Sequence, residues 1–168
     1  MVAAPVIDLS SARSGDASAW AATAVAIDDA CLRTGFFVVV GHGVDAEMAA
    51  VFDAARSFFA QPQAEKERTP RIDRYGYVPS AAQAVDHSRE SHLTEYLDLG
   101  LRGEVPVPAA MVAQVADYQR ALLPVAGALL RMMAGNLGVA DDFFAERMRR
   151  PQCRLRFLHY LPTPPDAD

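Results

Sequence analysis

The segment that most constrains the fold is a short apolar run enclosed by glycines. Residues 36–40 are five consecutive aromatic or β-branched residues, with Gly35 before them and Gly41 after them. Five residues are too few for a stable helix, and an apolar run without alternation is typical of a strand buried on both faces. The sequence therefore predicts a buried strand at 36–40.

Helices are expected on either side of this strand. Between Asp16 and Arg33 apolar residues recur at helical spacing, with Asp16 placed to cap the helix and Gly35 placed to end it. Cys31 falls on the apolar stripe and is expected to be a small buried hydrophobe. A second helix is expected from Asp45 to about residue 61, before Pro62. The stripe residues are Trp20, Ala24, Ile27 and Cys31 in the first helix and Met48, Val51, Phe52, Ala55 and Phe59 in the second.

The rest of the chain adds strands, one long helix and a polar stretch. Residues 63–90 are polar and interrupted by prolines and a glycine, so a long loop or flap is expected. The longest helix is expected from Val112 to Gly138, with a kink at Pro124. Strands are expected at residues 6–9, at 97–101 with one buried face, and at 153–160, and a short helix at 141–148. This mixture of helices and strands predicts the α+β fold class.

Composition indicates one globular chain. Of the 168 residues, 51% are hydrophobic and 22% charged, which excludes a disordered or fibrous chain. The net charge of −5 argues against a general nucleic-acid surface. No apolar run approaches the roughly 20 residues of a spanning helix, so neither a signal peptide nor a membrane segment is expected. Two distant cysteines, Cys31 and Cys153, favour a reducing cytoplasm, and the excess of Arg over Lys indicates a GC-rich bacterial origin.

The histidines are the first candidates for metal ligation. A site of two His and one carboxylate commonly contains an H-x-D or H-x-E pair, but none of the four histidines has Asp or Glu two positions later. His87 and His92 lie in a polar segment and are interpreted as solvated loop residues. His42, between two glycines, is interpreted as part of a tight turn in which the imidazole bonds to nearby backbone. No metal ligand and no catalytic residue is therefore expected in this chain.

Other motifs for catalysis or binding are missing from the sequence. It contains no G-x-S-x-G nucleophile motif, and neither cysteine has a C-x-x-C partner. The phosphate-binding pattern G-x-G-x-x-G would need a glycine where Ala46 stands. Five arginines could hold an anion through bidentate contacts, or form a solvated face paired with nearby acids. They are Arg147, Arg149, Arg150, Arg154 and Arg156.

Four stretches follow one another in an informative order. They are P-V-I-D-L at 5–9, A-C-L-R-T-G-F-F-V-V-V-G-H-G-V at 30–44, R-Y-G-Y-V-P at 74–79 and C-R-L-R-F-L-H-Y-L-P at 153–162. Together they resemble the N-terminal part of the isopenicillin N synthase-like family of iron(II)/2-oxoglutarate-dependent oxygenases. The segment T-E-Y-L-D-L-G at 94–100 is also similar to a family strand, K-E-x-F-D-x-G, with Thr94 in place of the usual Lys. The resemblance spans nearly the whole chain.

The resemblance implies a helical N-terminal region wrapped on a double-stranded β-helix, or jelly roll. Residues 1–150 would form the N-terminal region, and residues 151–168 the first jelly-roll strand and a tail. In the family, the strand similar to residues 155–160 precedes the H-x-D motif, the distal His and the R-x-S pair that grips oxoglutarate. All of these would lie beyond Asp168, so we expect the front half of an oxygenase, truncated before its catalytic remainder.

The resemblance also implies roles for three side chains. Tyr160 matches a strand tyrosine that in relatives hydrogen-bonds the carboxylate of oxoglutarate or substrate, a task that suits a phenol as a neutral donor at pH 7. An ordinary strand tyrosine is the alternative. Tyr77 and Arg74 match a flap that borders the substrate cleft in relatives. Leu155 and Phe157 are expected in the jelly-roll core.

Two functions stay open on the sequence alone. In the first, the parent protein is an oxidoreductase that uses Fe(II), 2-oxoglutarate and O2 to hydroxylate, desaturate or cyclise a small organic substrate. The 168-residue chain alone would then bind neither cofactor and be inactive. In the second, the chain is a non-catalytic interaction module that associates through open sheet edges. In either case the isolated chain is expected to expose apolar surface and to aggregate or oligomerise.

Overall fold

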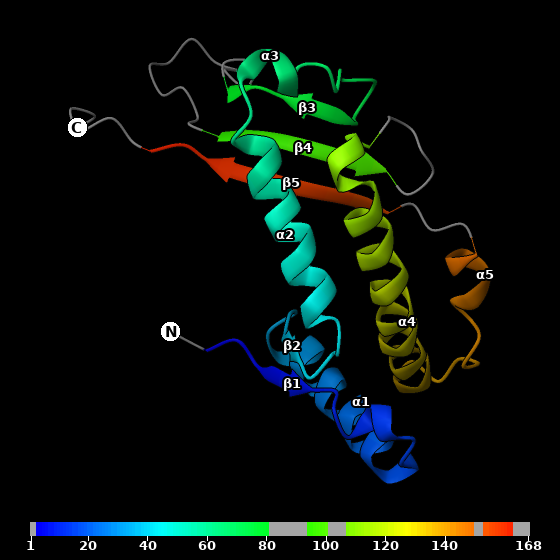
Figure 1. Cartoon of the computed structure of the whole chain (residues 1–168). Helices are drawn as coiled ribbons and strands as arrows, with labels where there is room; N and C mark the ends of the chain where they lie inside the picture. Colours follow the sequence, from blue (N-terminus) through cyan, green and yellow to red (C-terminus); the bar gives the residue numbers. More distant parts are fainter. Residues whose placement is uncertain (1–2, 81–93, 101–106, 150–152, 163–168) are drawn as a thin grey trace. The chain divides into compact units, whose positions relative to one another are not determined.

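A computed structural model describes residues 3–80, 94–100, 107–149 and 153–162 (Figure 1). The chain forms two compact units, each assembled from two separate stretches. The first unit combines Met1–Ala49 with Asp117–Pro151, and the second combines Ala50–Ala116 with Gln152–Asp168. The sequence predicts a domain boundary between residues 150 and 151 of the parent protein. That boundary stays a prediction.

The first unit contains a two-stranded sheet packed with helices. Strand β1, Val6–Asp8, pairs in parallel with β2, Val38–Val40. A short 3-10 turn, Ala12–Ser14, and helix α1, Ala17–Arg33, connect the two strands, because parallel neighbours need a crossover connection. Most of helix α4, Val112–Asn136, and the short helix α5, Ala145–Met148, complete the unit. Its buried core consists of Ile7, Leu9, Ala12, Ile27, Ala30 and Met132.

The long helices begin and end close to the predicted signals. The carboxylate of Asp16 accepts a backbone hydrogen bond of 2.8 Å in the first turn of α1. Gly35 and Gly138 follow α1 and α4 with φ angles of 77° and 67°, a region that glycine adopts without strain. Pro124 lies inside α4, which is the longest helix among the described residues. Helix α5 begins later than predicted, because residues 141–144 form turns instead of its first turn.

Two residues of the predicted helical stripes lie outside the buried faces. In α1, Ala30 is buried and the next residue, Cys31, is exposed. In α2, Asp45–Phe59, Val51 is buried and the next residue, Phe52, is 57% exposed. The predictions of burial for Cys31 and Phe52 were therefore wrong. Each follows a buried residue by one helical step of about 100°, which turns it away from the packed face.

The predicted buried strand at 36–40 is shorter and more exposed than expected. Only Val38–Val40 forms the strand, and Phe36, Val38 and Val40 are 58%, 47% and 39% exposed. Val39 alternates with them and packs against the core. The prediction of burial on both faces was wrong, because β2 has β1 as its single strand neighbour in the described residues and the face of the pair that carries Val6, Val38 and Val40 is exposed.

The turn after β2 is built as the sequence predicts. Gly41 and Gly43 have φ angles of 62° and 71°. Between them, Nδ1 of His42 accepts a hydrogen bond of 3.2 Å from the backbone N–H of Val44. Arg13 donates to the carbonyl of Gly41 at 3.0 Å and braces the same turn from a distant part of the chain. The structural interpretation of His42 is therefore confirmed.

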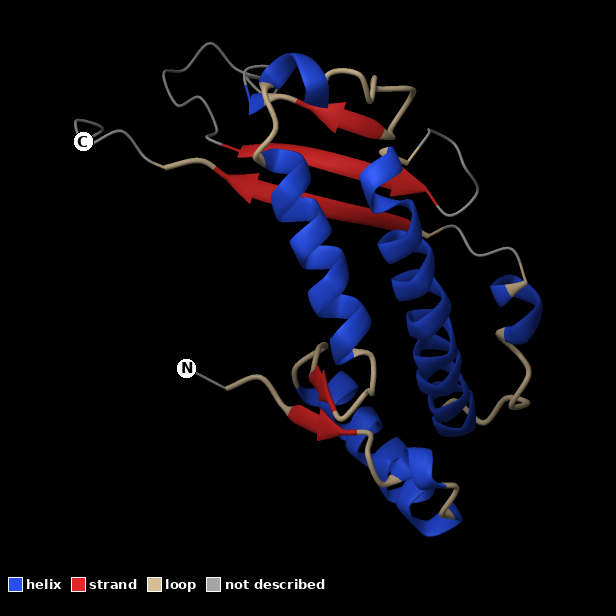
Figure 2. Ribbon diagram, viewed as in Figure 1, coloured by secondary structure: helices blue, strands red, loops and turns tan. Residues whose placement is uncertain are grey.

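The second unit is organised around an antiparallel sheet (Figure 2). Strand β4, Thr94–Gly100, lies between β3, Gly76–Val78, and β5, Arg154–Tyr160. The predicted strand at 153–160 is thus confirmed, and Leu101 of the predicted strand at 97–101 lies outside the described residues. Helix α3, Gln63–Lys66, and β3 occupy part of the predicted loop at 63–90, so that prediction was wrong for these two short elements.

The core of the second unit is formed by apolar residues of the sheet and of the helices that pack on it. Phe157 of β5 is 6% exposed, as expected, and Leu155 is partly buried. The core includes Val51, Ala55, Phe58, Phe59, Val78, Leu97, Leu99, Met111, Val115 and Phe157.

Two further features concern the helices. A 3-10 turn, Ala109–Met111, precedes α4. Among the described helices of the chain, none combines the length and the apolar character required to cross a membrane.

Candidate functional site

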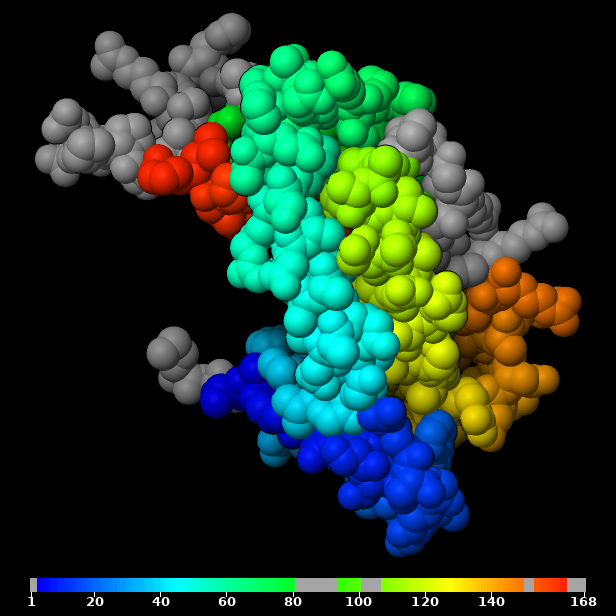
Figure 3. Space-filling view, viewed as in Figure 1, coloured from blue at the N-terminus to red at the C-terminus, as the bar shows by residue number. Residues whose placement is uncertain are grey.

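The two faces of β5 differ in burial and chemistry. Successive strand residues point to opposite faces, so Arg156, Leu158 and Tyr160 share one face while Phe157 and His159 share the other. Tyr160 is 70% exposed, and the red C-terminal end of β5 lies at the surface in Figure 3. Its hydroxyl makes no hydrogen bond to any described residue. The outward face of β5 therefore carries an exposed phenol with no partner among the described residues.

Arg156 is held on this outward face by a two-pronged ion pair. Its Nε and Nη2 donate to the Asp98 carboxylate at 2.7 and 2.6 Å, and its guanidinium carbon lies 4.3 Å from the centre of the Tyr96 ring. The hydrogen bonds to Asp98 raise the pKa of Arg156. Asp98 is only 1% exposed, whereas the alternation of β4 had predicted it on an open face. That prediction was wrong because the Asp98 carboxylate is covered by its own partner.

The inward face of the sheet carries a buried carboxylate, Glu95, which is 3% exposed. Lys66 Nζ lies 2.7 Å from its Oε2, and the Tyr77 hydroxyl donates to the same oxygen. His159 Nδ1 lies 2.8 Å from Oε1. Both oxygens of the carboxylate are therefore engaged, and we call Glu95, Lys66, Tyr77 and His159 the Glu95 cluster.

The charges of the Glu95 cluster follow from these contacts. Burial by itself raises the pKa of Glu95, but hydrogen bonds from Lys66, Tyr77 and His159 outweigh it and hold this pKa below its ordinary value. An ionised carboxylate only accepts hydrogen bonds, so the proton between Glu95 and His159 resides on Nδ1 of the imidazole. Burial and the neighbouring Glu95 raise the pKa of Tyr77, which keeps the phenol protonated as a donor.

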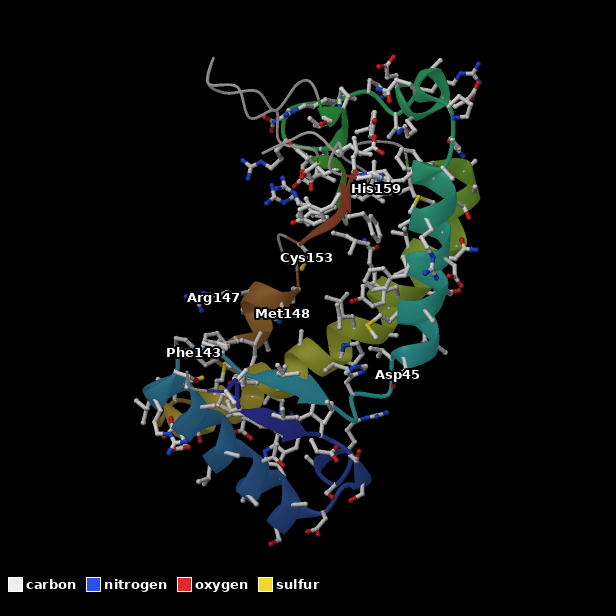
Figure 4. All side chains as sticks on the ribbon, turned by 90° about the vertical axis from the view of Figure 1, so that its left-hand side faces the viewer. Asp45, Phe143, Arg147, Met148, Cys153 and His159 are labelled. Carbon is white, nitrogen blue, oxygen red and sulfur yellow. The ribbon has the colours of Figure 1, made fainter. Side chains whose placement is uncertain are left out.

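Aromatic rings enclose the Glu95 cluster. The His159 ring stacks on Phe59, the last residue of α2, with centroids 5.1 Å apart and an interplanar angle of 30°. Figure 4 shows His159 on β5, on the side of the strand that faces α2. Phe58 meets the Tyr77 ring edge-on at 5.8 Å. The cluster thus joins α2, α3 and all three strands of this sheet.

The structure separates the three side chains that the resemblance singled out. Tyr77 is 3% exposed and lies opposite Leu97, on the inward face of the sheet, whereas Tyr160 lies on the outward face. Arg74 is in the turn before β3, with its side chain 65% exposed and its Nε 3.9 Å from Asp73. Their roles toward substrate and cofactor stay predictions.

The described residues do not fit an iron centre. In the parts of the chain that the structure describes, no group of three His, Cys, Asp or Glu is arranged to hold a metal ion. Glu95 has both oxygens engaged, and Nδ1 of His42 already accepts a backbone hydrogen bond. His87 and His92 lie outside the described residues.

The arginines between 147 and 156 that the structure describes each have a partner within their own unit. Arg147 packs over the ring of Phe143 at 5.2 Å, as Figure 4 shows for the labelled pair. Arg149 pairs with Glu146 at 2.8 Å in the same unit. Arg156 belongs to the second unit, where Asp98 neutralises it, and Arg150 lies outside the described residues. The interpretation as solvated side chains paired with acids therefore holds for Arg149.

Comparison with known proteins decides the family. The family described as non-haem dioxygenase in morphine synthesis N-terminal matches residues 4–118. The chain belongs to the iron(II)/2-oxoglutarate-dependent oxygenase family. The 2-oxoglutarate-dependent dioxygenase citB of Monascus ruber is 31% identical to it, over 84% of this chain and 51% of the relative. The chain spans about half the length of the curated oxygenases that it matches.

Solved structures show the same oxygenase fold. A 2OG-Fe(II) oxygenase family protein from Caulobacter crescentus superposes with a TM-score of 0.81 at 24% identity, over 99% of this chain and 59% of that one. JOX2, solved in complex with 2OG, Fe and JA, superposes with a TM-score of 0.73 at 27% identity, over 94% of this chain and 48% of that one. The expected mixed fold of an oxygenase N-terminal part is therefore confirmed.

The sequence analysis missed Glu95 and Asp98 as buried, paired acids. A signal for both was present in the sequence. The two acids are three residues apart in one strand, and His159 and Arg156 are three residues apart in the other. A single antiparallel register therefore places each acid opposite a basic partner, as the β4–β5 ladder does.

Proposed function

We propose that this chain is the N-terminal part of an oxidoreductase that uses Fe(II), 2-oxoglutarate and O2 to oxidise a small organic substrate. Family membership supports the reaction class. Because the chain spans about half the length of its relatives, the activity is assigned to the parent protein. The oxidation would be a hydroxylation, a desaturation or a ring closure. The observation that carries the proposal within this chain is the exposed hydroxyl of Tyr160.

Tyr160 is proposed to bind the carboxylate of oxoglutarate or of the substrate. A phenol is a neutral donor at pH 7 and forms a strong hydrogen bond with an ionised acceptor. The hydroxyl has no partner among the described residues, and the neighbouring Arg156 is already paired with Asp98. When bound, Fe(II) and oxoglutarate supply the oxidising chemistry, while the protein supplies binding and orientation.

Arg74 and Tyr77 are proposed to border the substrate. Arg74 is exposed in the turn before β3 and can contact a substrate directly. Tyr77 lies at the buried base of the same segment, where Glu95 holds its hydroxyl. The substrate role is therefore direct for Arg74 and supportive for Tyr77.

The 168 residues alone are proposed to be inactive and to bind neither cofactor. The sequence contains no H-x-D or H-x-E pair, and the described side chains offer no three-ligand site. The metal ligands of the parent protein are assigned to the half of the family's length that this chain does not span.

Oxygen consumption tests this proposal. The full-length parent should consume O2 when Fe(II), 2-oxoglutarate and a suitable small molecule are all supplied, and should stop when Fe(II) or oxoglutarate is withheld. The 168-residue chain in the same assay should consume none. Turnover by the 168-residue chain, or turnover by the parent without oxoglutarate, would show the proposal to be wrong.

A second candidate function is self-association through open sheet edges. It is favoured by the apolar residues that the β1–β2 pair leaves exposed, with Val6 64% and Phe36 58% accessible. A two-stranded sheet has unpaired backbone groups along its outer edges, which can pair with a second chain. This function would require a natural protein that ends near residue 168, and the reading frame beyond that position distinguishes the two candidates.

The proposed compartment is the cytoplasm. The proposal rests on the two cysteines, Cys31 and Cys153, which are 122 residues apart in the sequence, unlike the dense cysteine pattern of a secreted disulfide scaffold. The proposed partners of the parent oxygenase are a small-molecule substrate and O2, without nucleic acid or membrane.

A further inference from the structure

Tyr160 lies at the last rung of the β4–β5 ladder. Its partner across the ladder is Thr94, the first residue of β4. The Tyr160 ring is 70% exposed, and no described side chain bonds to its hydroxyl. The direction of the Tyr160 ring therefore depends on the backbone at this rung. Strand pairing opens most readily at the end of a ladder, so this rung by itself holds the ring only loosely.

The neighbouring rung is fixed much more firmly. Glu95 and His159 are direct partners in the ladder, and their side chains are hydrogen-bonded at 2.8 Å. Glu95 is in turn held by Lys66 of α3 at 2.7 Å, and the His159 ring stacks on Phe59 of α2. Two helices thus fix the rung that comes one residue before Tyr160.

Consecutive side chains of a strand point to opposite faces. Holding His159 inward therefore holds Tyr160 outward, because a twist of the strand that released one would also redirect the other. We infer that the Glu95–His159 pair is a positioning device that orients Tyr160 toward its carboxylate ligand. This inference rests on the function proposed above for Tyr160 and adds two positioning residues to it.

A set of variants at His159 separates positioning from general stability. His159→Phe keeps the ring on Phe59 but removes the donor to Glu95, which retains its contacts with Lys66 and Tyr77. His159→Asn keeps an N–H donor near the position of Nδ1 and serves as the rescue variant. Leu97→Ala is the control, because it removes a fully buried side chain from the same sheet, opposite Phe157, and leaves both residues of the Glu95–His159 pair unchanged.

The experiment is a double-mutant cycle on the full-length parent protein loaded with Fe(II) in the absence of oxygen. The affinity for 2-oxoglutarate is measured by calorimetry for the wild type, His159→Phe, Tyr160→Phe and the double variant, with a thermal melt of each. We expect His159→Phe to weaken binding about 3-fold or more when Tyr160 is present, and less than about 2-fold when Tyr160→Phe is already in place. His159→Asn should bind like the wild type, and Leu97→Ala should melt earlier with unchanged affinity.

The outcomes distinguish the two levels of the argument. If Tyr160→Phe binds oxoglutarate like the wild type, the proposed role of Tyr160 fails and the positioning inference fails with it. If Tyr160→Phe weakens binding but His159→Phe does not, or weakens it equally in both backgrounds, only the positioning inference is overturned. If Leu97→Ala weakened oxoglutarate binding as much as His159→Phe does, the loss would reflect the stability of the sheet, and the positioning inference would be overturned as well. Should His159→Phe not fold, His159→Leu, which also lacks the donor, replaces it in the cycle.

Discussion

Lys66 Nζ lies 2.7 Å from Glu95 Oε2, and the two side chains are only 8% and 4% exposed. Removing Lys66 leaves the Glu95 carboxylate buried with its contacts to Tyr77 and His159 but without the ammonium group that pairs with it. We expect Lys66→Met to lower the free energy of unfolding of the parent protein by about 3–5 kcal/mol, measured by urea denaturation.

An exposed ion pair of the same segment provides the control. Glu65 pairs with Arg68 at 2.8 Å, with side chains 45% and 75% exposed, so Glu65→Gln should cost no more than about 1 kcal/mol. Adding Glu95→Gln to Lys66→Met should restore part of the lost stability, because no unpaired charge then stays buried. Equal costs for Lys66→Met and Glu65→Gln would contradict the importance of burial here.

The lowered pKa of Glu95 predicts a loss of stability in acid. The ordinary value is 4.5, and the folded protein holds the group below it, so the unfolded chain takes up the proton first as the pH falls. The stabilisation is fully present above pH 4.5 and disappears as the pH drops through the folded-state pKa. Urea midpoints measured between about pH 6 and pH 3 should fall less steeply for Glu95→Gln than for the wild type.

Tyr160→Phe tests the proposed ligand contact itself. Loss of one hydrogen bond to a charged acceptor should cost roughly 1.5–3 kcal/mol, which is about a 10-fold to 150-fold loss of affinity for oxoglutarate or substrate. The melting temperature should change little, because the side chain is exposed and its ring is kept. Arg74→Ala is the comparison, and we expect it to weaken substrate binding and leave oxoglutarate binding unchanged. A lower melting temperature with normal affinities would identify an ordinary strand tyrosine instead.

Iron binding by the isolated chain is expected to be weak and nonspecific. The 168 residues contain four histidines, two of them five residues apart in one polar segment, and no H-x-D or H-x-E pair. Calorimetry with Fe(II) under argon should show no stoichiometric site of micromolar affinity. Such a site would assign a ligand role to His42, His87, His92 or His159.

The isolated chain is also expected to self-associate. Val6, Phe36, Val38 and Val40 are exposed on or beside the two-stranded sheet of the first unit. Light scattering after gel filtration should detect oligomers or aggregates, and a hydrophobic dye should bind. A monodisperse monomer that melts cooperatively and binds no dye would contradict this expectation.

Features governed by a few neighbouring residues could be predicted from the sequence alone. The cap at Asp16, the turn around His42 and the strand that ends at Tyr160 all form where local pattern places them. Each depends on backbone geometry or periodicity within one short segment. The ordered motifs were also enough to indicate the oxygenase family, which the match to residues 4–118 confirms.

Burial and pairing were decided only by the tertiary structure. Cys31 lies on an apolar stripe and is nevertheless exposed, because the residue before it, Ala30, lies on the packed face of the helix. Glu95 meets His159 across 64 residues of sequence, and Asp98 meets Arg156 across 58. An acid on a strand is solvated or buried according to the side chain that arrives opposite it, and strand pairing sets that partner. Sequence alone therefore determined the long helices and the strands with a clear local pattern, but not the short α3 and β3, whereas chain-distant packing decided that two acids of one strand became buried and paired.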